Sequence, residues 1–202
     1  MKNFKLYFEH YLELLEEAKA NTHLTHLEEL ILTRGKGGYD QAKGFLTNLL
    51  GHLQGKSKRK IGTTVKWDGA PAIFAGKHPD TGKFFVGTKS IFNKEPKINY
   101  NDQDVEVNHG HAPGLADKLK KALKHLPKLG IKNIIQGDFM FDSSSVNKEN
   151  IDGVVHYTFQ PNTIKYAVEA DSDLGRQIAN SVFGIIFHTE YSDLDSPAAF
   201  GA

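Results

Sequence analysis

The 202-residue sequence predicts an α+β fold in which helices come first and a mostly antiparallel sheet follows. Before residue 55, apolar residues recur at helical spacing, whereas the later segments are short, rich in β-branched residues and bounded by turn residues. Pro79-Asp80-Thr81-Gly82 separates two of these later segments and predicts a hairpin. Tight turns between consecutive strands favour antiparallel pairing, so a doubly wound parallel sheet is not expected.

Residues 1–55 are expected to form a helical region. Over residues 4–19, apolar residues recur every three or four positions with glutamates between them, which is typical of an amphipathic helix. A second helix is expected to begin near Thr25 and to stop at residues 34–38, where three glycines occur. A third helix is expected over residues 40–53.

Residues 56–191 are expected to hold the sheet. The predicted strands cover, in chain order, residues 61–66, 70–75, 83–88, 131–141, 153–159, 163–168 and 183–188. Helices are predicted over residues 114–126 and 173–181. Residues 93–112, with His109 and His111, are predicted to be a polar surface loop, and residues 192–202 a flexible tail.

Composition excludes several classes of protein. The chain is 39% hydrophobic, enough for a buried core, and its formal net charge of +1 gives no overall basic field to attract nucleic acid. It has no cysteine, which excludes disulfides, thiol nucleophiles and cysteine zinc sites. No apolar run is long enough to span a bilayer, and the first residues do not look like a signal peptide, so we expect a cytoplasmic protein without a membrane partner.

The segment with the most chemical content is Val65-Lys66-Trp67-Asp68-Gly69. Its β-branched start delivers Lys66 to a tight Asp-Gly turn. A lysine amine becomes a strong nucleophile when desolvation or neighbouring cations lower its pKa. Asp68 can orient that amine or accept a hydrogen bond from a ribose, and Gly69 would let a nucleotide approach the backbone closely.

This segment resembles motif I, the lysine-x-aspartate-glycine signature of the covalent nucleotidyltransferases. That superfamily comprises ATP-dependent DNA ligases, RNA ligases and mRNA-capping enzymes. The resemblance implies a ligase-like core in which Lys66 attacks the α-phosphorus of ATP and carries AMP as a phosphoramidate, with Val65 and Gly69 beside the nucleotide. A divergent member from a tailed phage would fit, and it would act in the host cytoplasm.

Two later segments resemble further motifs of the family, in the family's order. The run from Gly87 to Ser90 resembles motif Ia, which implies that Lys89 contacts the ribose or the phosphates. The run from Ile134 to Phe141 resembles motif III, although the family usually has glutamate where this chain has Asp138. The resemblance gives Asp138 contact with the ribose and with Mg²⁺ held mainly by the ATP phosphates.

The run from Asn162 to Val168 looks like the strand that follows motif III in RNA ligases. The resemblance makes Phe159 or Tyr166 a candidate for stacking on adenine, although an aromatic residue on a strand is also typical of a core. Residues 1–55 have no counterpart in the family.

Two features depart from the family's pattern. Phe183 stands where motif IV would have an acid, and no lysine follows Lys165, so the lysine pair of motif V is missing. These departures indicate either a fragment whose remaining motifs lie downstream, which we expect, or a divergent member with weakened catalysis.

Lys58, Arg59 and Lys60 either neutralise the phosphates of a nucleic acid or form a solvated linker. The leading hypothesis is an ATP-dependent nucleotidyltransferase that uses Mg²⁺ and passes AMP to a nucleic-acid 5′-phosphate. One alternative is a ligase-like module that binds nucleotide or nucleic acid without catalysis. Another is an interaction protein in which residues 1–53 form a helical docking element. DNA or RNA, ligation or capping, ATP or GTP, and the oligomeric state all stay open.

Overall fold

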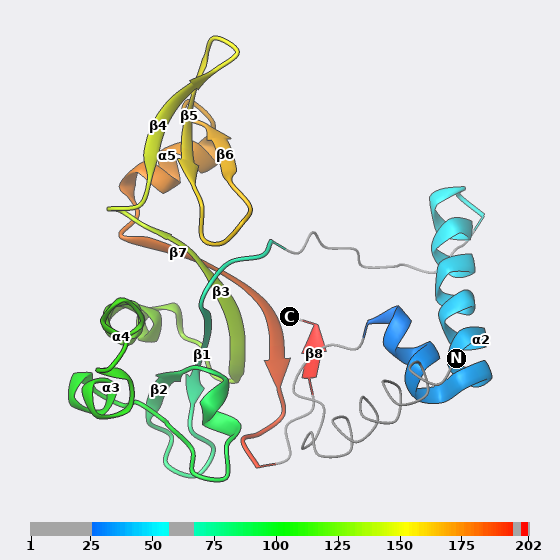
Figure 1. The fold of residues 1–202 in the computed structure, drawn as a ribbon, viewed down its shortest axis with the longest axis horizontal. Coiled ribbons are helices and arrows are strands. Elements are labelled where there is room, and N and C mark those ends of the chain that lie inside the picture. The colour runs from blue at the N-terminus through cyan, green and yellow to red at the C-terminus, as the bar shows by residue number, and fades with distance from the viewer. Residues whose placement is uncertain (1–25, 57–66, 196–198, 202) are drawn as a thin grey trace, which may run out of the picture. The chain divides into compact units, whose positions relative to one another are not determined.

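A computed structural model describes residues 26–56, 67–195 and 199–201 (Figure 1). The chain divides into two compact units, residues 1–65 and 66–202, which are described separately. Several predictions lie outside the described residues: the helix over residues 4–19, the strand over residues 61–66, and the roles of Lys58, Arg59, Lys60, Val65 and Lys66.

The first unit contains the helix α2, Leu27–Leu53. The backbone leaves helical geometry at Gly35, with φ 53° and ψ −129°, a conformation that glycine adopts without steric strain. The predicted break between two helices is therefore confirmed. The helix resumes directly after Gly35 rather than at residue 40, so the predicted gap between the two helices was too long. At its start, the backbone N–H of His26 donates to Glu29 Oε2 at 3.2 Å.

The second unit contains a five-stranded sheet with strand order β2-β1-β3-β7-β8, in which every neighbouring pair is antiparallel. This confirms the predicted pairing. The strands are β1 (Ala72–Lys77), β2 (Phe84–Gly87), β3 (Ile134–Asp142), β7 (Phe183–Tyr191) and β8 (Ala199–Gly201). The turn after β1 closes the predicted hairpin. The prediction of a flexible tail was wrong for residues 199–201, which form β8 and pair with β7.

A second sheet has strand order β4-β5-β6 and lies beside the helix α5, Asp173–Asn180 (Figure 1). Its strands are β4 (Asn147–Ile151), β5 (Val154–Phe159) and β6 (Tyr166–Glu169). The sequence analysis missed β4, because its residues are mostly polar and show no alternation. Pairing with β5 forms this strand, through a turn in which Asp152 and Gly153 have positive φ.

Residues 88–130 form four short helical segments: η1 (Lys89–Phe92), α3 (Asp102–His109), α4 (Pro113–His125) and η2 (Leu126–Leu129). The predicted loop over residues 93–112 is therefore confirmed for residues 93–101 and wrong for residues 102–109, which form α3, whereas the helix at residues 114–126 is confirmed. The Asn101 side chain caps α3 by accepting from the Asp104 N–H at 2.9 Å. His109 is buried rather than on a surface loop, and burial lowers its pKa.

One face of the five-stranded sheet packs against α3 and α4. Its main contacts are Ile73 and Ala75 of β1 and Phe139 of β3, which cluster with Val105, Leu119 and Ala122. Ile134 of β3 belongs to a different cluster on the other face, with Phe74 and Tyr191. Because side chains alternate along a strand, Asp138 shares the face of Ile134 and points away from α3 and α4.

Candidate functional site

Asp68 and Gly69, where a tight turn was predicted, form irregular backbone before β1 and lie directly against β3. The Gly69 N–H donates to Asp138 Oδ2 at 3.1 Å, and the Ala70 N–H donates to the Phe139 carbonyl oxygen at 3.0 Å. Two segments that resemble different motifs, 69 residues apart in sequence, therefore share a direct hydrogen bond. Asp138 is 8% exposed, so this bond is shielded from water.

Gly69 is required by this close approach. A Cβ at this position would lie 2.6 Å from the Phe139 carbonyl oxygen, 2.7 Å from the Met140 sulfur and 2.9 Å from Asp138 Cβ. The space beside Gly69 is thus filled by β3. The predicted reason for this glycine was the close approach of a nucleotide, but β3 occupies the side on which a Cβ would lie.

A histidine that the sequence analysis did not select faces Asp138. Nε2 of His188 lies 3.4 Å from Asp138 Oδ1, and its Nδ1 lies 2.8 Å from the Thr189 hydroxyl. Pairing between β3 and β7 shifts register here, from Gln136 opposite Thr189 to Gly137 opposite Phe187, so His188 is the extra residue of a β-bulge. Bulges re-aim side chains. A polar residue inside an apolar strand was the available signal in the sequence.

Tyr166 also contacts the segment Trp67-Asp68, and its ring stacks on other aromatic residues of the protein. Its ring stacks on Trp67, with 5.1 Å between centroids, and its hydroxyl hydrogen-bonds to the backbone of Asp68. Phe159, the other aromatic candidate, is buried and stacks on Tyr166 with 5.6 Å between centroids. Sequence reasoning missed Trp67 and Asn162, which complete this group.

A cavity of about 260 Å³ lies beside Trp67. Phe159 lines it and Tyr166 does not; the other walls include Met140, Phe141, Val168, Ile178 and Ile186. Ligand pockets usually measure roughly 300–1,000 Å³, so this cavity has room for a small planar group rather than for a whole nucleotide.

Lys89 is placed apart from this group. It is exposed and begins η1, directly after β2. Within the described part of the chain, no hydrogen bond or ion pair links Lys89 to Asp68 or Asp138. The structure therefore joins Asp68, Gly69, Asp138, Phe159 and Tyr166 by direct or shared contacts, and it leaves Lys89 outside.

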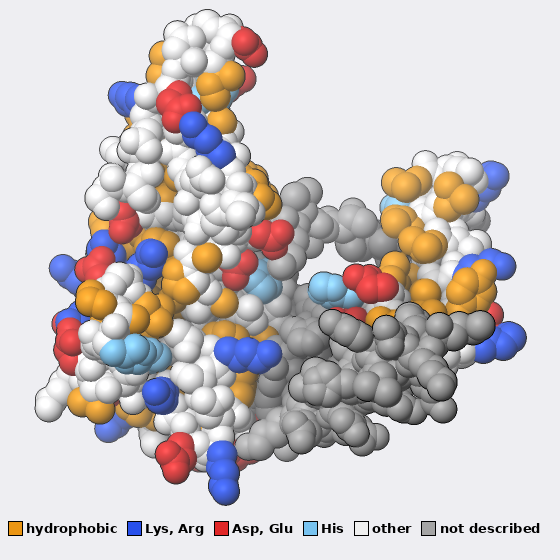
Figure 2. Space-filling view, viewed as in Figure 1, with side chains coloured by type: hydrophobic (Ala, Val, Ile, Leu, Met, Phe, Trp, Pro, Cys, Tyr) orange, Lys and Arg blue, Asp and Glu red, His pale blue; other side chains and the backbone are white. Residues whose placement is uncertain are grey.

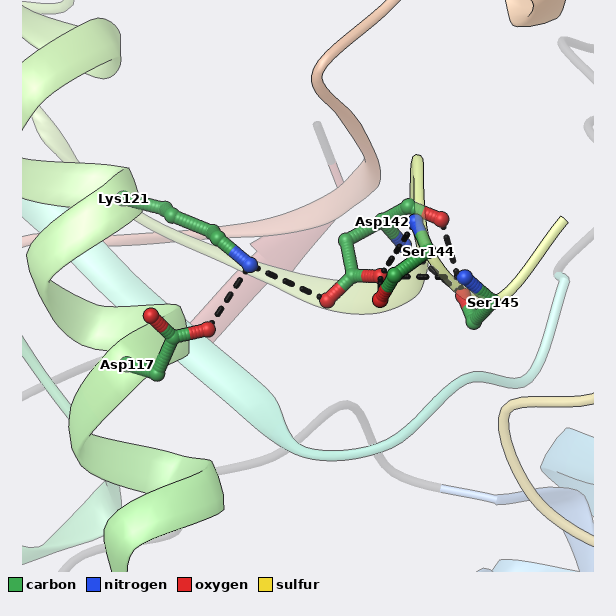
Figure 3. Close-up of polar contacts among 5 residues, drawn as sticks. All are labelled: Asp117, Lys121, Asp142, Ser144 and Ser145. Carbon is green, nitrogen blue, oxygen red and sulfur yellow. Dashed lines mark hydrogen bonds and ion pairs between the residues drawn. The ribbon is translucent and has the colours of Figure 1, made fainter.

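The other end of β3 carries a different aspartate. Asp142 Oδ1 accepts from the Ser144 hydroxyl at 2.5 Å and from the Ser144 and Ser145 N–H groups, and Oδ2 lies 3.1 Å from Lys121 Nζ (Figure 3). The Ser144 hydroxyl, followed by Lys121, lowers the pKa of Asp142 to about 2. Lys121 also pairs with Asp117 at 2.7 Å. Asp142 is therefore satisfied on both oxygens.

A cleft of about 540 Å³ beside α4 is lined by Lys120, Lys121 and Lys124. Lys120 pairs with Glu106, and Lys121 pairs with Asp117 and Asp142. Two of its three lysines are thus neutralised by carboxylates, and the cleft offers little net charge to a polyanion.

The described side chains contain no group of three or more histidines and carboxylates that could hold a metal ion. Asp138 belongs to no such group among the described residues, and its two oxygens face Gly69 and His188. The described residues therefore do not form a magnesium site by themselves. Among the described residues, Asp138 could contribute one carboxylate to an ion held mainly by nucleotide phosphates.

None of the helices in the described ranges has the length and apolar character needed to cross a membrane. Comparison with curated proteins and with solved structures finds no match. A family model with the description "Family of unknown function (DUF6267)" matches residues 21–202, nine-tenths of the chain. The chain therefore belongs to the DUF6267 family.

Proposed function

We propose that this protein is an ATP-dependent nucleotidyltransferase of the ligase type, with Lys66 as the nucleophile. The observation that carries the proposal is the hydrogen bond from Gly69 to Asp138. The sequence supplies two motif-like segments far apart in the chain, and a shared site requires them to meet. Pairing of β1 with β3, with Ala72 opposite Asp138, brings the two segments together and places the acid of the second beside the glycine of the first.

In the proposed reaction, Lys66 Nζ in its neutral form attacks the α-phosphorus of ATP. A nitrogen–phosphorus bond forms, the bond from the α-phosphorus to the bridging oxygen breaks, pyrophosphate leaves, and the amine proton passes to solvent. The AMP then passes to the 5′-phosphate of a nucleic acid, and a 3′-hydroxyl displaces it. Mg²⁺ bound to the ATP phosphates would offset their charge.

The other residues have supporting roles in the proposal. Asp68 would orient the Lys66 amine, and Asp138 would hold the ribose while its Oδ2 fixes the Gly69 amide. Phe159 lines the cavity beside Trp67 and would contact the base. Lys89, which is exposed, would reach the phosphates from solvent, and Lys58, Arg59 and Lys60 would meet the nucleic acid.

Labelling with ATP tests the proposal directly. Incubating the full chain with α-labelled ATP and Mg²⁺ should give a labelled protein after denaturation, whereas γ-labelled ATP should leave none, because pyrophosphate departs. Lys66→Ala and Lys66→Arg should both abolish the label, since neither side chain offers a neutral primary amine. Lys89→Ala is the matched control and should weaken ATP binding while still forming the adduct.

An unlabelled wild-type protein would sink the covalent mechanism. If such a protein still bound ATP reversibly, and Lys66→Ala changed only the affinity, the chain would be a binding module without catalysis. One observation favours that alternative: Phe183, at the position of the missing acid, stacks on Phe139 with 5.6 Å between centroids and packs with the core. A core aromatic residue cannot replace a carboxylate that contacts a ligand.

A third role, for the first unit, is supported by the surface of α2. Eight large apolar side chains are exposed along this helix: Leu27, Ile31, Leu32, Tyr39, Phe45, Leu46, Leu50 and Leu53. Hydrophobic side chains are visible on the helix in Figure 2. Exposed apolar surface of this extent is typical of an interaction site. We propose that α2 takes part in docking, alongside the catalytic role of the second unit. Replacing Phe45 and Leu50 with serine should leave adenylation intact and abolish such docking.

A further inference from the structure

Tyr166 and Asn162 hold the main chain of Asp68 from a distant part of the sequence. The Tyr166 hydroxyl accepts from the Asp68 N–H at 3.0 Å and donates to the Asp68 carbonyl oxygen at 2.9 Å. Asn162 Nδ2 donates to the same carbonyl oxygen at 3.1 Å. A tyrosine hydroxyl has one proton and two lone pairs, so it can make both bonds at once. Both backbone polar groups of Asp68 thus have partners 94–98 residues away.

The two side chains are themselves held in place. Asn162 Oδ1 accepts from the Ile164 N–H at 2.7 Å, which leaves its Nδ2 to face Asp68. The Tyr166 ring stacks on Trp67 with 16° between planes and on Phe159 with 23°. Phe159 in turn is buried and contacts Phe141 of β3, with 4.9 Å between centroids. The tyrosine hydroxyl is therefore fixed by the core of the second sheet.

We propose that Tyr166 and Asn162 are positioning residues for the nucleophile, an inference that rests on the proposed function of Lys66. They fix the peptide two residues after Lys66, while the Asp138 carboxylate fixes the next amide, that of Gly69. Three side chains from two different parts of the chain thus bind two consecutive residues. This arrangement sets the path of the main chain that follows the nucleophile.

The assignment changes the role expected for Tyr166. A base that stacked on this ring would have to displace Trp67 or Phe159, because the ring already stacks on both. The two roles make different demands on the hydroxyl. Stacking needs only the ring, whereas positioning needs the oxygen atom. Removing that one atom therefore separates them.

The test is the rate of adduct formation by Tyr166→Phe over a range of ATP concentrations. Misplacement of a reacting group by about 1 Å can lower a rate on the order of 100-fold, so we expect a loss of about 10- to 100-fold in the maximal rate. The ATP concentration at half-maximal rate should not change, because the clamp binds main chain rather than nucleotide. Tyr157→Phe is the matched control on β5, since the Tyr157 hydroxyl makes no hydrogen bond to the described residues, and it should react like wild type.

A second variant shows whether the two residues act together. Asn162→Ala removes the other donor to the Asp68 carbonyl, so its effect and that of Tyr166→Phe should not add in the double variant. Trp67 is the only tryptophan, and its emission reports whether the stack survives. A shift of that emission to the red in Tyr166→Phe would show that Trp67 no longer stacks in the variant. In that case the maximal rate of Asn162→Ala alone tests the positioning role.

The outcomes are distinct. A wild-type rate in Tyr166→Phe, or a change confined to the ATP concentration dependence, would overturn the positioning role and leave the function of Lys66 standing. No adduct in the wild-type protein would instead remove the proposed function itself. The clamp would be supported by a lower maximal rate in Tyr166→Phe with unchanged Trp67 emission, a wild-type rate in Tyr157→Phe, and effects of Tyr166→Phe and Asn162→Ala that do not add.

Discussion

The two aspartates of β3 lie four residues apart and have opposite kinds of surroundings. Asp142 is surrounded by groups close to it in sequence or on the neighbouring helix: Ser144, Ser145 and Lys121 (Figure 3). Asp138 contacts the backbone of Gly69, from 69 residues earlier, and faces His188, from 50 residues later. Asp142 closes a local turn, whereas Asp138 links β3 to β7 and to the segment that precedes β1.

The difference shows how a structural carboxylate can be distinguished from a candidate functional one. Asp142 has a hydroxyl, two N–H groups and an ammonium group, which stabilise its charge and lower its pKa. Asp138 has a single N–H donor and a histidine at the limit of hydrogen-bond distance. Asp138 therefore keeps lone pairs that a ribose hydroxyl could use, and Asp142 has few to offer.

The largest expected effect comes from replacing Asp138, with a replacement of Asp142 as the comparison. Asp138→Ala removes the acceptor of the Gly69 N–H. The backbone at Asp68 and Gly69 should then shift, and we expect the rate of adduct formation to fall on the order of 100-fold. Asp142→Asn should leave adduct formation unchanged. The measurement is the rate of labelling with α-labelled ATP for both variants. Equal losses in the two variants would show that Asp138 matters only for the integrity of β3.

The next largest effect should come from Gly69→Ala. The new Cβ would meet a backbone oxygen that cannot rotate away, and overpacking of this kind destabilises proteins by about 1–3 kcal/mol. Gly114→Ala is the control, because a Cβ there meets no atom within 4 Å and alanine favours the first turn of α4. Urea unfolding followed by Trp67 emission measures both variants. A Gly69→Ala protein as stable as wild type would contradict the close packing against β3.

The smallest effect is the acid dependence that Asp142 contributes. Its pKa falls from 3.8 in the unfolded chain to about 2 in the folded protein, so the unfolded state binds the proton first. The stabilisation is therefore complete above about pH 4 and is lost as the pH falls toward 2. Because the side chain is partly screened by solvent, we expect ~1–2 kcal/mol. The stability difference between wild type and Asp142→Asn, measured from pH 6 to pH 2, should shrink over this window, and a constant difference would refute the assignment.

Local patterns predicted much of the fold. The turn after β1, the break at Gly35 and the helix α4 each depend on residues within a few positions of one another, and all three are confirmed. The elements that were not predicted have weak apolar patterns of their own. β4 and β8 exist because a partner strand binds them, and α3 buries few apolar side chains, so its sequence looks like a loop.

The candidate site divides in the same way. The sequence alone predicted which residue types are candidates for chemistry: a lysine before Asp-Gly, an acid at the end of an apolar run, and aromatic residues on later strands. Only the tertiary structure decided that Gly69 meets Asp138, that a bulge turns His188 toward that acid, and that Tyr166 uses its hydroxyl on Asp68. A residue's type and neighbours are written in the chain, but a contact across 50 to 100 residues depends on strand register, and register is set by the packing of the whole sheet.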